Sequence, residues 1–308
     1  MDVSSNAPIR VICGPTAAGK TFAAVWFARL AEVSVISADS RQLYRGFDIG
    51  TAKPTRREAL AVPHIGIDVL DPTERASAAW WADCADEWIR DVARAGRTPI
   101  VVGGTGLYLR ALFGSLFEEP PLDADARASI QGALAPLETG ELRRWVEALD
   151  PARAHLGRTQ LLRAIEIPLL TGRRVSELHR ENARPPRRRA RYLLVDPGPS
   201  LQQKIADRVR TMVASRWTGE VRDLMRVVPA DAPAWNAAGY GAIRELVLGQ
   251  LTLDEAVERV IIETRQYAKR QRTWFRNQLA GEDVTQLSTD QMDWPERATA
   301  WWNGEVVA

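Results

Sequence analysis

The spacing of apolar and polar positions changes along the chain, and these changes predict alternating strands and helices. Short apolar runs rich in β-branched residues predict strands over residues 9–13, 33–37, 65–70 and 99–102. Apolar residues at helical spacing predict helices over residues 21–30 and 78–95. Strands and helices that alternate in this way predict a parallel sheet covered on both faces, with ligands at the carboxyl ends of its strands.

Two proline pairs, Pro120-Pro121 and Pro185-Pro186, bracket a segment in which the pattern becomes that of amphipathic helices. We therefore expect a small all-helical insertion domain over residues 119–186. The core would then consist of residues 1–118 and 187–308.

After the second proline pair, a strand-like run at residues 192–195 returns the chain to the sheet. Further helices are predicted over residues 201–213, 219–227 and 253–278. The tail after Gly281 has no readable period, and we expect its tryptophans to pack on the surface.

The composition is that of an ordinary folded protein. Hydrophobic residues make up 45% and charged residues 26% of the 308 residues, and no long apolar run predicts a membrane span. The polar start of the chain lacks the pattern of a secretory signal, so we expect a cytoplasmic protein. We also expect a monomer without membrane partners. Cys13, Cys84 and three scattered histidines give no metal-ligand spacing, which argues against a transition-metal site.

A glycine-rich segment lies between the first predicted strand and the first predicted helix. Its spacing fits a phosphate-binding loop in full, over Gly14, Pro15, Thr16, Ala17, Ala18, Gly19, Lys20 and Thr21. In such a loop, backbone N–H groups face phosphate oxygens, the lysine neutralises charge, and the hydroxyl after it suits Mg²⁺. The expected fold class is therefore α/β, with a P-loop NTPase-like parallel sheet flanked by helices. The loop leaves open whether the diphosphate belongs to a phosphoryl donor or to a leaving group.

Two further segments follow predicted strands and should meet the loop at one edge of the sheet. Asp39 comes directly after the second strand, where a carboxylate could hold Mg²⁺ through water, accept a proton from a nucleophile, or cap the next helix. Thr105 lies in the turn Gly103-Gly104-Thr105-Gly106. That turn either brings its hydroxyl and amides to the same ligand or serves only as a strand-to-helix turn.

Positive charge is clustered late in the chain although the net charge is only +2. One patch comprises Arg184, Arg187, Arg188, Arg189 and Arg191. A second is a stripe on the helix predicted over residues 253–278, formed by Arg265, Lys269, Arg272 and Arg276. Such a stripe suits a nucleic-acid backbone; the alternative is a solvated face that is salt-bridged to its neighbours.

Taken together, these segments resemble the tRNA dimethylallyltransferase family, also called isopentenyl-tRNA transferases, of the bacterial type. The resemblance includes the phosphate loop and the turn at Gly103, and it covers nearly the whole chain. Its most specific part is the block from Asp39 to Pro54. Other matching segments are Pro63-His64, Ile67-Asp68, Arg163 to Glu166, Ala238 to Tyr240 and Thr264 to Arg276.

The resemblance implies transfer of a dimethylallyl group from dimethylallyl diphosphate to N6 of the adenosine just 3′ of the tRNA anticodon, with Mg²⁺ as cofactor. It assigns Asp39 as the general base for the exocyclic amine, a weak nucleophile that gains from proton removal. Lys20, Arg208 and Thr21 with Mg²⁺ would stabilise the leaving diphosphate, and Thr105 would hydrogen-bond near its bridging oxygen. Residues 14–21 and Arg208 would bind the diphosphate.

The partner implied by the resemblance is the anticodon stem-loop of tRNA, whose adenosine must be flipped out of its stack. The residues expected to contact it are Asp39, Ser40, Arg41, Gln42, Thr105, Arg127, Gln160, Arg163, Gly239, Tyr240, Arg265, Lys269, Arg270, Arg272 and Arg276. The remaining alternatives are an adenylate-type isopentenyltransferase, a P-loop kinase for a small molecule, and an RNA-binding module without catalysis. The first leaves the late basic stripe unexplained. The basic helix and the Asp39 block argue against the kinase, and the presence of Lys20, Thr21, Asp39 and Thr105 together argues against the module without catalysis.

Overall fold

The computed structural model describes residues 7–114, 122–181 and 185–305. The chain divides into two compact units, one comprising Met1–Phe113 with Arg187–Ala308 and the other comprising Gly114–Pro186. The boundary predicted between residues 118 and 119 lies outside the described residues, as do the first proline pair and Arg184. The predicted domain limits therefore stay a prediction.

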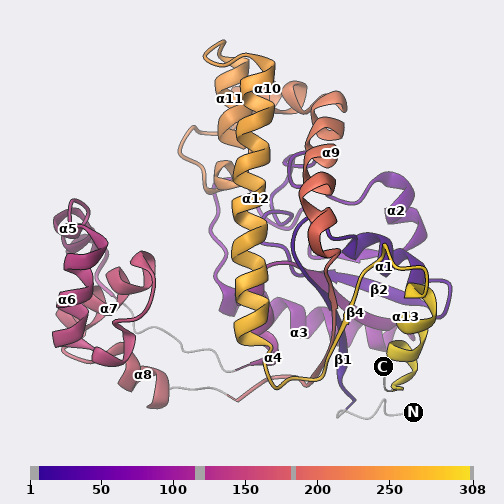
Figure 1. Ribbon diagram of the computed structural model, residues 1–308, viewed down its shortest axis with the longest axis horizontal. Helices are drawn as coiled ribbons and strands as arrows, with labels where there is room; N and C mark the ends of the chain where they lie inside the picture. The colour runs from indigo at the N-terminus through magenta and orange to yellow at the C-terminus, as the bar shows by residue number, and fades with distance from the viewer. Residues whose placement is uncertain (1–6, 115–121, 182–184, 306–308) are drawn as a thin grey trace. The chain divides into compact units, whose positions relative to one another are not determined.

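A six-stranded parallel sheet forms the centre of the first unit (Figure 1). Its strands are β1 (Ile9–Cys13), β2 (Val33–Ser37), β3 (His64–Ile65), β4 (Thr98–Gly103), β5 (Ala190–Val195) and β6 (Val284–Leu287). They lie in the order β3-β2-β4-β1-β5-β6. The α/β prediction is therefore confirmed, and the carboxyl ends of β2, β4 and β1 lie side by side at one edge.

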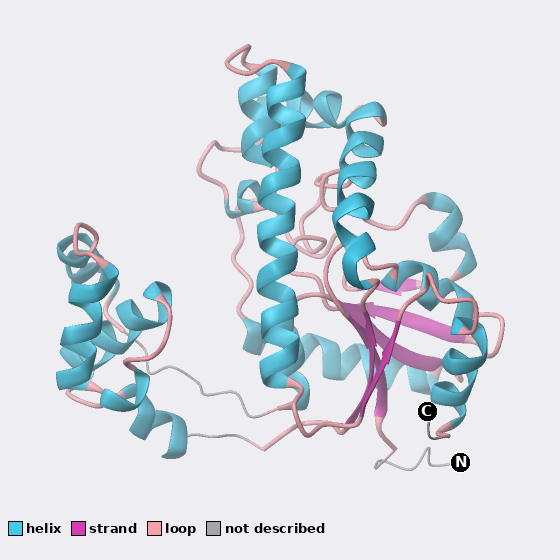
Figure 2. Cartoon of the chain, viewed as in Figure 1, coloured by secondary structure: helices cyan, strands magenta, loops and turns pink. Residues whose placement is uncertain are grey.

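Helices cover both faces of this sheet (Figure 2). The first-unit helices are α1 (Lys20–Phe27), α2 (Arg56–Ala61), α3 (Ala78–Arg94), α4 (Gly106–Phe113), α9 (Leu201–Ala214), α10 (Trp217–Val227), α11 (Tyr240–Val247), α12 (Leu253–Gln278) and α13 (Trp294–Asn303). The helices α1 and α13 share one buried core with Ile12, Ile100 and Leu193. Val11 and Val101 alternate with these residues and so face the opposite side, where α3 packs on β2 and β4 and also contacts α4.

The helix predicted over residues 253–278 has those limits in the structure, as α12. It starts there because Thr252 and Glu255 form a capping box, in which each side chain hydrogen-bonds the other's backbone N–H. Its buried residues, which include Ala256, Ala268 and Phe275, recur on one side. The helix packs along α9 and α11.

The predicted third strand was too long. β3 ends at Ile65 because Gly66 and Asp68 adopt positive φ values of 79° and 56°, which turn the chain. Leu70 then forms an isolated bridge with Tyr44.

The prediction for the tail was wrong. β6 extends the sheet beside β5 in parallel register, and α13 follows it. Trp301 of α13 is fully buried, lies 5.4 Å from the ring of Phe27, and donates a hydrogen bond to the carbonyl of Tyr192 over 3.1 Å. The tail therefore completes the core instead of coating the surface.

The second unit is helical where it is described. It contains α5 (Ala124–Leu134), α6 (Thr139–Leu149), α7 (Arg158–Thr171) and α8 (Val175–Glu181). Leu142, Leu161 and Ile165 belong to a buried cluster of its own. Over both units, none of the described helices is long and apolar enough to span a membrane.

Candidate active site

The phosphate-loop segment, residues 14–21, joins β1 to α1 and forms a cradle, a backbone conformation that can surround a phosphate group. Gly14 and Gly19 adopt φ values of 144° and 96°, and a Cβ on Gly14 would lie only 2.1 Å from the carbonyl oxygen of Val195. The Lys20 ammonium donates hydrogen bonds to the carbonyls of Gly14 and Pro15 over 3.0 and 2.8 Å. The lysine thus folds over its own loop, with the amino terminus of α1 directly behind it.

Lys20 and Arg208 are cations held in a desolvated place. Burial lowers the pKa of Lys20 from 10.5 to about 8, although the negative charge of Asp39 opposes this shift. Burial also lowers the pKa of Arg208, again opposed by Asp39. The structure therefore couples these three predicted site residues electrostatically, and desolvated cations gain most from meeting an anion.

Three chain segments meet where β2, β4 and β1 end. The backbone N–H of Thr105 donates to the carbonyl of Ala38 over 3.1 Å, and the Thr105 hydroxyl accepts from the N–H of Ser40 over 3.0 Å. A Cβ on Gly103 would lie 2.1 Å from the same Ala38 carbonyl oxygen, so only glycine allows this approach. The Gly103 turn is therefore more than a connection, because it fixes Thr105 beside the Asp39 segment.

Asp39 does not cap a helix. One carboxylate oxygen accepts a hydrogen bond from the N–H of Arg41 over 2.9 Å, and residues 40–43 that follow form a turn. Ser40 and Gln42 of this turn bind neighbouring segments: the N–H of Ser40 donates to the Thr105 hydroxyl, and the Gln42 side chain accepts from the Ser37 hydroxyl and donates to the carbonyl of Ala52.

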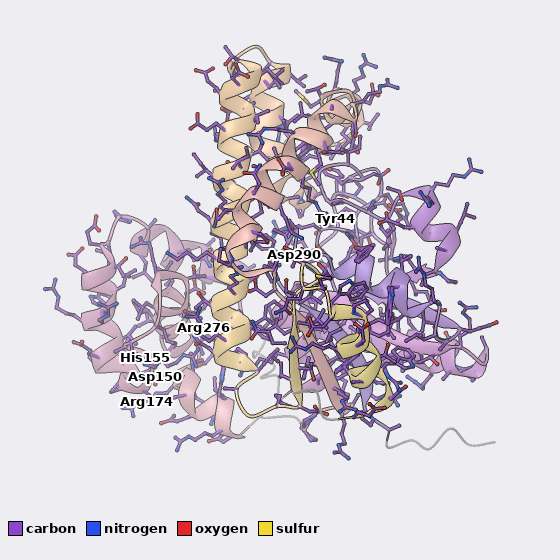
Figure 3. All side chains as sticks on the ribbon, turned by 45° about the vertical axis from the view of Figure 1, so that its right-hand side comes forward. Tyr44, Asp150, His155, Arg174, Arg276 and Asp290 are labelled. Carbon is purple, nitrogen blue, oxygen red and sulfur yellow. The ribbon has the colours of Figure 1, made fainter. Side chains whose placement is uncertain are left out.

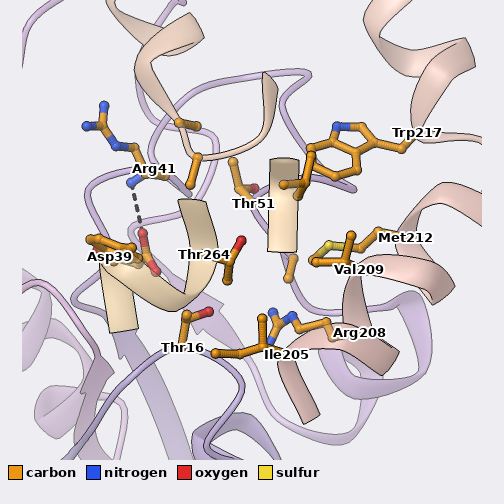
Figure 4. A pocket seen from close by; sticks show the side chains of 16 residues that line it. Thr16, Asp39, Arg41, Thr51, Ile205, Arg208, Val209, Met212, Trp217 and Thr264 are labelled. Carbon is orange, nitrogen blue, oxygen red and sulfur yellow. Dashed lines mark hydrogen bonds between the residues drawn. The ribbon is translucent and has the colours of Figure 1, made fainter. Parts of the chain in front are cut away.

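Asp39 lines a cavity together with Thr16 of the phosphate loop and Arg208 of α9 (Figure 4). Beyond these polar groups the lining is mostly apolar, with Val209, Met212, Trp217 and Val260, and it also includes Thr51 and Thr264. A second cavity is lined by Thr21 and again by Arg208. The site can thus hold a ligand that is anionic at one end and apolar at the other.

Two residues of the site were not among the predicted site residues. Tyr267 lines the cavity, its hydroxyl is hydrogen-bonded to Thr105, and burial raises its pKa to about 12. Gln271 is buried and bridges two segments: its side-chain oxygen accepts from the N–H of Thr16 over 2.8 Å, and its amide donates to the carbonyl of Gly104 over 2.9 Å. Their position in the family-like run from Thr264 was visible, but the contacts were not.

The basic stripe of α12 divides into two parts. Arg272 donates hydrogen bonds to the Asp196 carboxylate over 2.8 Å and to the carbonyl of Gly198. Arg265 donates to the carbonyl of Gln202 over 3.4 Å. Lys269 and Arg276 are exposed and form no ion pair with any described residue. Arg276 lies on the lower part of α12 (Figure 3), and Arg270 is exposed with its guanidinium 5.8 Å from the ring of Tyr267. Among the described residues, Lys269, Arg270 and Arg276 are thus the exposed cations of α12 for which no ion pair is found.

Tyr240 cannot stack on a base, because its ring is fully buried and its hydroxyl donates to Glu220 over 2.6 Å. Gly239 precedes it at the start of α11 with φ 87°.

The predicted tRNA contacts of the second unit are engaged within that unit. Arg127 and Arg163 both pair with the buried Glu166, at 3.3 and 2.6 Å. Gln160 accepts a hydrogen bond from the N–H of Gly157 at the start of α7. Contact of these side chains with RNA stays a prediction.

The described residues offer few side chains that could ligate a metal ion. No group of three or more His, Cys, Asp or Glu side chains that could hold an ion occurs in the described ranges. Mg²⁺ commonly binds through one or two protein oxygens together with substrate phosphates and water. The Thr21 hydroxyl, in the first turn of α1 beside the phosphate loop, fits that mode.

This chain matches protein-family models and curated relatives that are isopentenyl or dimethylallyl transferases. Residues 42–278 match the IPP transferase family, and residues 7–69 match the isopentenyl transferase family. The tRNA dimethylallyltransferase 1 of Syntrophotalea carbinolica is 41% identical over 275 residues, which are 87% of this chain and 88% of that protein.

Solved structures that resemble this chain are also transferases that act on tRNA. The tRNA isopentenylpyrophosphate transferase of Bacillus halodurans superposes with a TM-score of 0.68 at 33% identity, covering 96% of this chain and 95% of that one. A eukaryotic dimethylallyltransferase acting on tRNA superposes with a TM-score of 0.76 at 25% identity, covering 98% of this chain and 81% of that one.

Proposed function

The chain belongs to the IPP transferase family, and from this premise we propose that it transfers a dimethylallyl group from dimethylallyl diphosphate to N6 of an adenosine in tRNA. The proposal rests on one observation. Asp39 lines a cavity with Thr16 of the phosphate loop, and the lining becomes mostly apolar beyond them. This arrangement suits an allylic diphosphate whose leaving group lies beside a base.

In the proposed reaction a C–N bond forms between the adenine amine and the first allylic carbon, while the C–O bond to diphosphate breaks. The amine proton passes to the Asp39 carboxylate, and the electron pair of the C–O bond leaves with the diphosphate. Lys20 and Arg208 stabilise the charge that appears on the leaving oxygen, since both are desolvated cations near Asp39. Tyr267 and Ser40 orient Thr105 toward the same place.

We propose that Mg²⁺ is the cofactor and that the Thr21 hydroxyl would hold it. When bound, the ion would add positive charge at the diphosphate oxygens. The chain itself supplies the phosphate-loop N–H groups.

We further propose that Lys269, Arg270 and Arg276 contact tRNA phosphates. They are exposed on α12, the helix that also carries Tyr267 at the cavity and Gln271 against the N–H of Thr16. Phosphate contacts at this helix would supply binding energy for flipping the adenosine out of its stack. The remaining proposals are that the enzyme is monomeric and acts in the cytoplasm, where tRNA is found.

Offering two acceptors together tests this function. The enzyme is incubated with dimethylallyl diphosphate, an anticodon stem-loop and AMP, and the products are weighed by mass spectrometry. We expect the stem-loop to gain one dimethylallyl group and AMP to remain unchanged. A prenylated AMP would indicate the adenylate-type activity. In a second reaction with ATP, any phosphorylated product would indicate a kinase.

A further inference from the structure

Trp217 closes the apolar end of the cavity. It is the first residue of α10, it is only 1% exposed, and it lines the cavity opposite the polar groups of Thr16 and Asp39 (Figure 4). Between these two ends the lining comes from Val209 and Met212 of α9, from Thr264 of α12, and from Thr51. A ligand held by the phosphate loop would therefore direct its apolar tail toward the indole of Trp217.

The indole is fixed in place by its neighbours. A Cβ added to Gly50 would lie 2.3 Å from the Trp217 ring, and one added to Gly239 would lie 2.6 Å from it. On a third side the ring meets Tyr240 edge-on, with the centroids 5.4 Å apart and an interplanar angle of 79°. Gly50, Gly239 and Tyr240 pack closely against the Trp217 ring. The indole therefore has no room to rotate toward them and lengthen the cavity.

We propose that Trp217 determines the chain length of the prenyl donor: it admits a five-carbon allylic diphosphate and excludes a ten-carbon one. This inference rests on the proposed prenyl transfer. Met212, which also borders the cavity, is flexible and adapts to a ligand, whereas a wedged tryptophan is a rigid stop. The phosphate loop and Asp39 act at the other end and do not sense the tail.

Transfer and binding of dimethylallyl and geranyl diphosphate are compared for the wild type, Trp217→Leu and Trp217→Ala. We expect the wild type to prefer the five-carbon donor by about 100-fold or more in kcat/KM, the scale of discrimination by a rigid pocket. In Trp217→Leu the preference should fall below about tenfold, because geranyl transfer rises. Trp235→Ala is the matched control, since Trp235 also packs on Tyr240 and is buried but does not line the cavity.

Calorimetric titration of the two diphosphates without RNA separates this inference from the proposed function. If the wild type transfers neither group to RNA, the proposed function fails, while Trp217-dependent selectivity in binding would still uphold the inference. Equal use or binding of both donors by the wild type would overturn it even if the variants fail to fold. So would a folded Trp217→Leu that still rejects geranyl diphosphate, or a Trp235→Ala control that accepts it equally well.

Discussion

At the scale of single residues, substitution of Asp39 should distinguish RNA binding from catalysis. We expect Asp39→Asn to lower kcat by about 100-fold or more, the typical contribution of a general base, and to leave the dissociation constant for tRNA unchanged. The amide keeps an oxygen that can accept from the N–H of Arg41, so the turn should persist. Single-turnover rates and RNA binding by fluorescence anisotropy provide the two measurements.

The control for this substitution is Asp71→Asn, which removes an exposed carboxylate paired with Arg45 and should change neither quantity. Parallel losses of affinity and rate in Asp39→Asn would argue that the carboxylate organises the RNA site and does not act in the reaction.

Lys20 gives the reaction a pH dependence. Its pKa is lowered to about 8 in the free enzyme, and its charged form is the one that attracts diphosphate. We therefore expect kcat/KM for dimethylallyl diphosphate to be constant more than about one pH unit below 8, to decline near pH 8, and to fall by about tenfold per pH unit well above it. A profile measured with saturating stem-loop checks this. In Lys20→Met the activity should be low and this limb absent; a limb that persists in the variant would assign it to another group.

At the scale of elements, α12 carries the exposed cations that we propose contact RNA, and it is joined to the phosphate loop through Gln271. Gln271→Met removes two hydrogen bonds, each contributing on the order of 1 kcal/mol, and leaves the N–H of Thr16 and the carbonyl of Gly104 without that partner. We expect KM for the diphosphate donor to rise about tenfold or more, with a smaller change in kcat. Steady-state kinetics measure both.

Gln266→Met is the matched control for Gln271, because Gln266 is exposed on the same helix and should be neutral. A lower melting temperature of Gln271→Met with an unchanged KM would reduce Gln271 to a packing role.

The exposed cations of α12 make a separate prediction. We expect Lys269→Ala to weaken stem-loop binding several-fold and to reduce the slope of log affinity against log salt by about one. Arg259→Ala on the same helix should leave the slope unchanged, because Arg259 is paired with Glu245 and Glu263. An unchanged slope for Lys269→Ala would place the RNA phosphates elsewhere.

The sequence predicted the elements whose limits are decided locally. The period and the capping residues of α12 are contained in its own segment, and the phosphate loop has an unmistakable spacing between a strand and a helix. It did not predict β6, because half of the residues in Val284–Leu287 are polar and the strand exists only by pairing with β5. Gln271 and Trp217 were missed for a related reason, since their contacts join segments far apart in the chain.

At the scale of the whole molecule, the phosphate loop, Asp39 and α12 all lie in the unit formed by Met1–Phe113 and Arg187–Ala308. The chain leaves this unit and returns to it at neighbouring positions, because the N–H of Arg187 donates a hydrogen bond to the carbonyl of Leu112 over 3.1 Å. A short glycine–serine linker in place of residues 115–186 should therefore close the chain without straining the sheet.

We expect this deletion variant to fold and to bind dimethylallyl diphosphate with an affinity within about twofold of the full chain, because the cradle is complete without the excised residues. Modification of the stem-loop should fall by about 100-fold, since the RNA contacts that we propose for the second unit, Arg127 and Arg163 among them, would be missing. Calorimetry and the transfer assay measure the two effects. Full transfer activity would show that RNA recognition needs only the first unit, and loss of diphosphate binding would show that the cradle depends on the second.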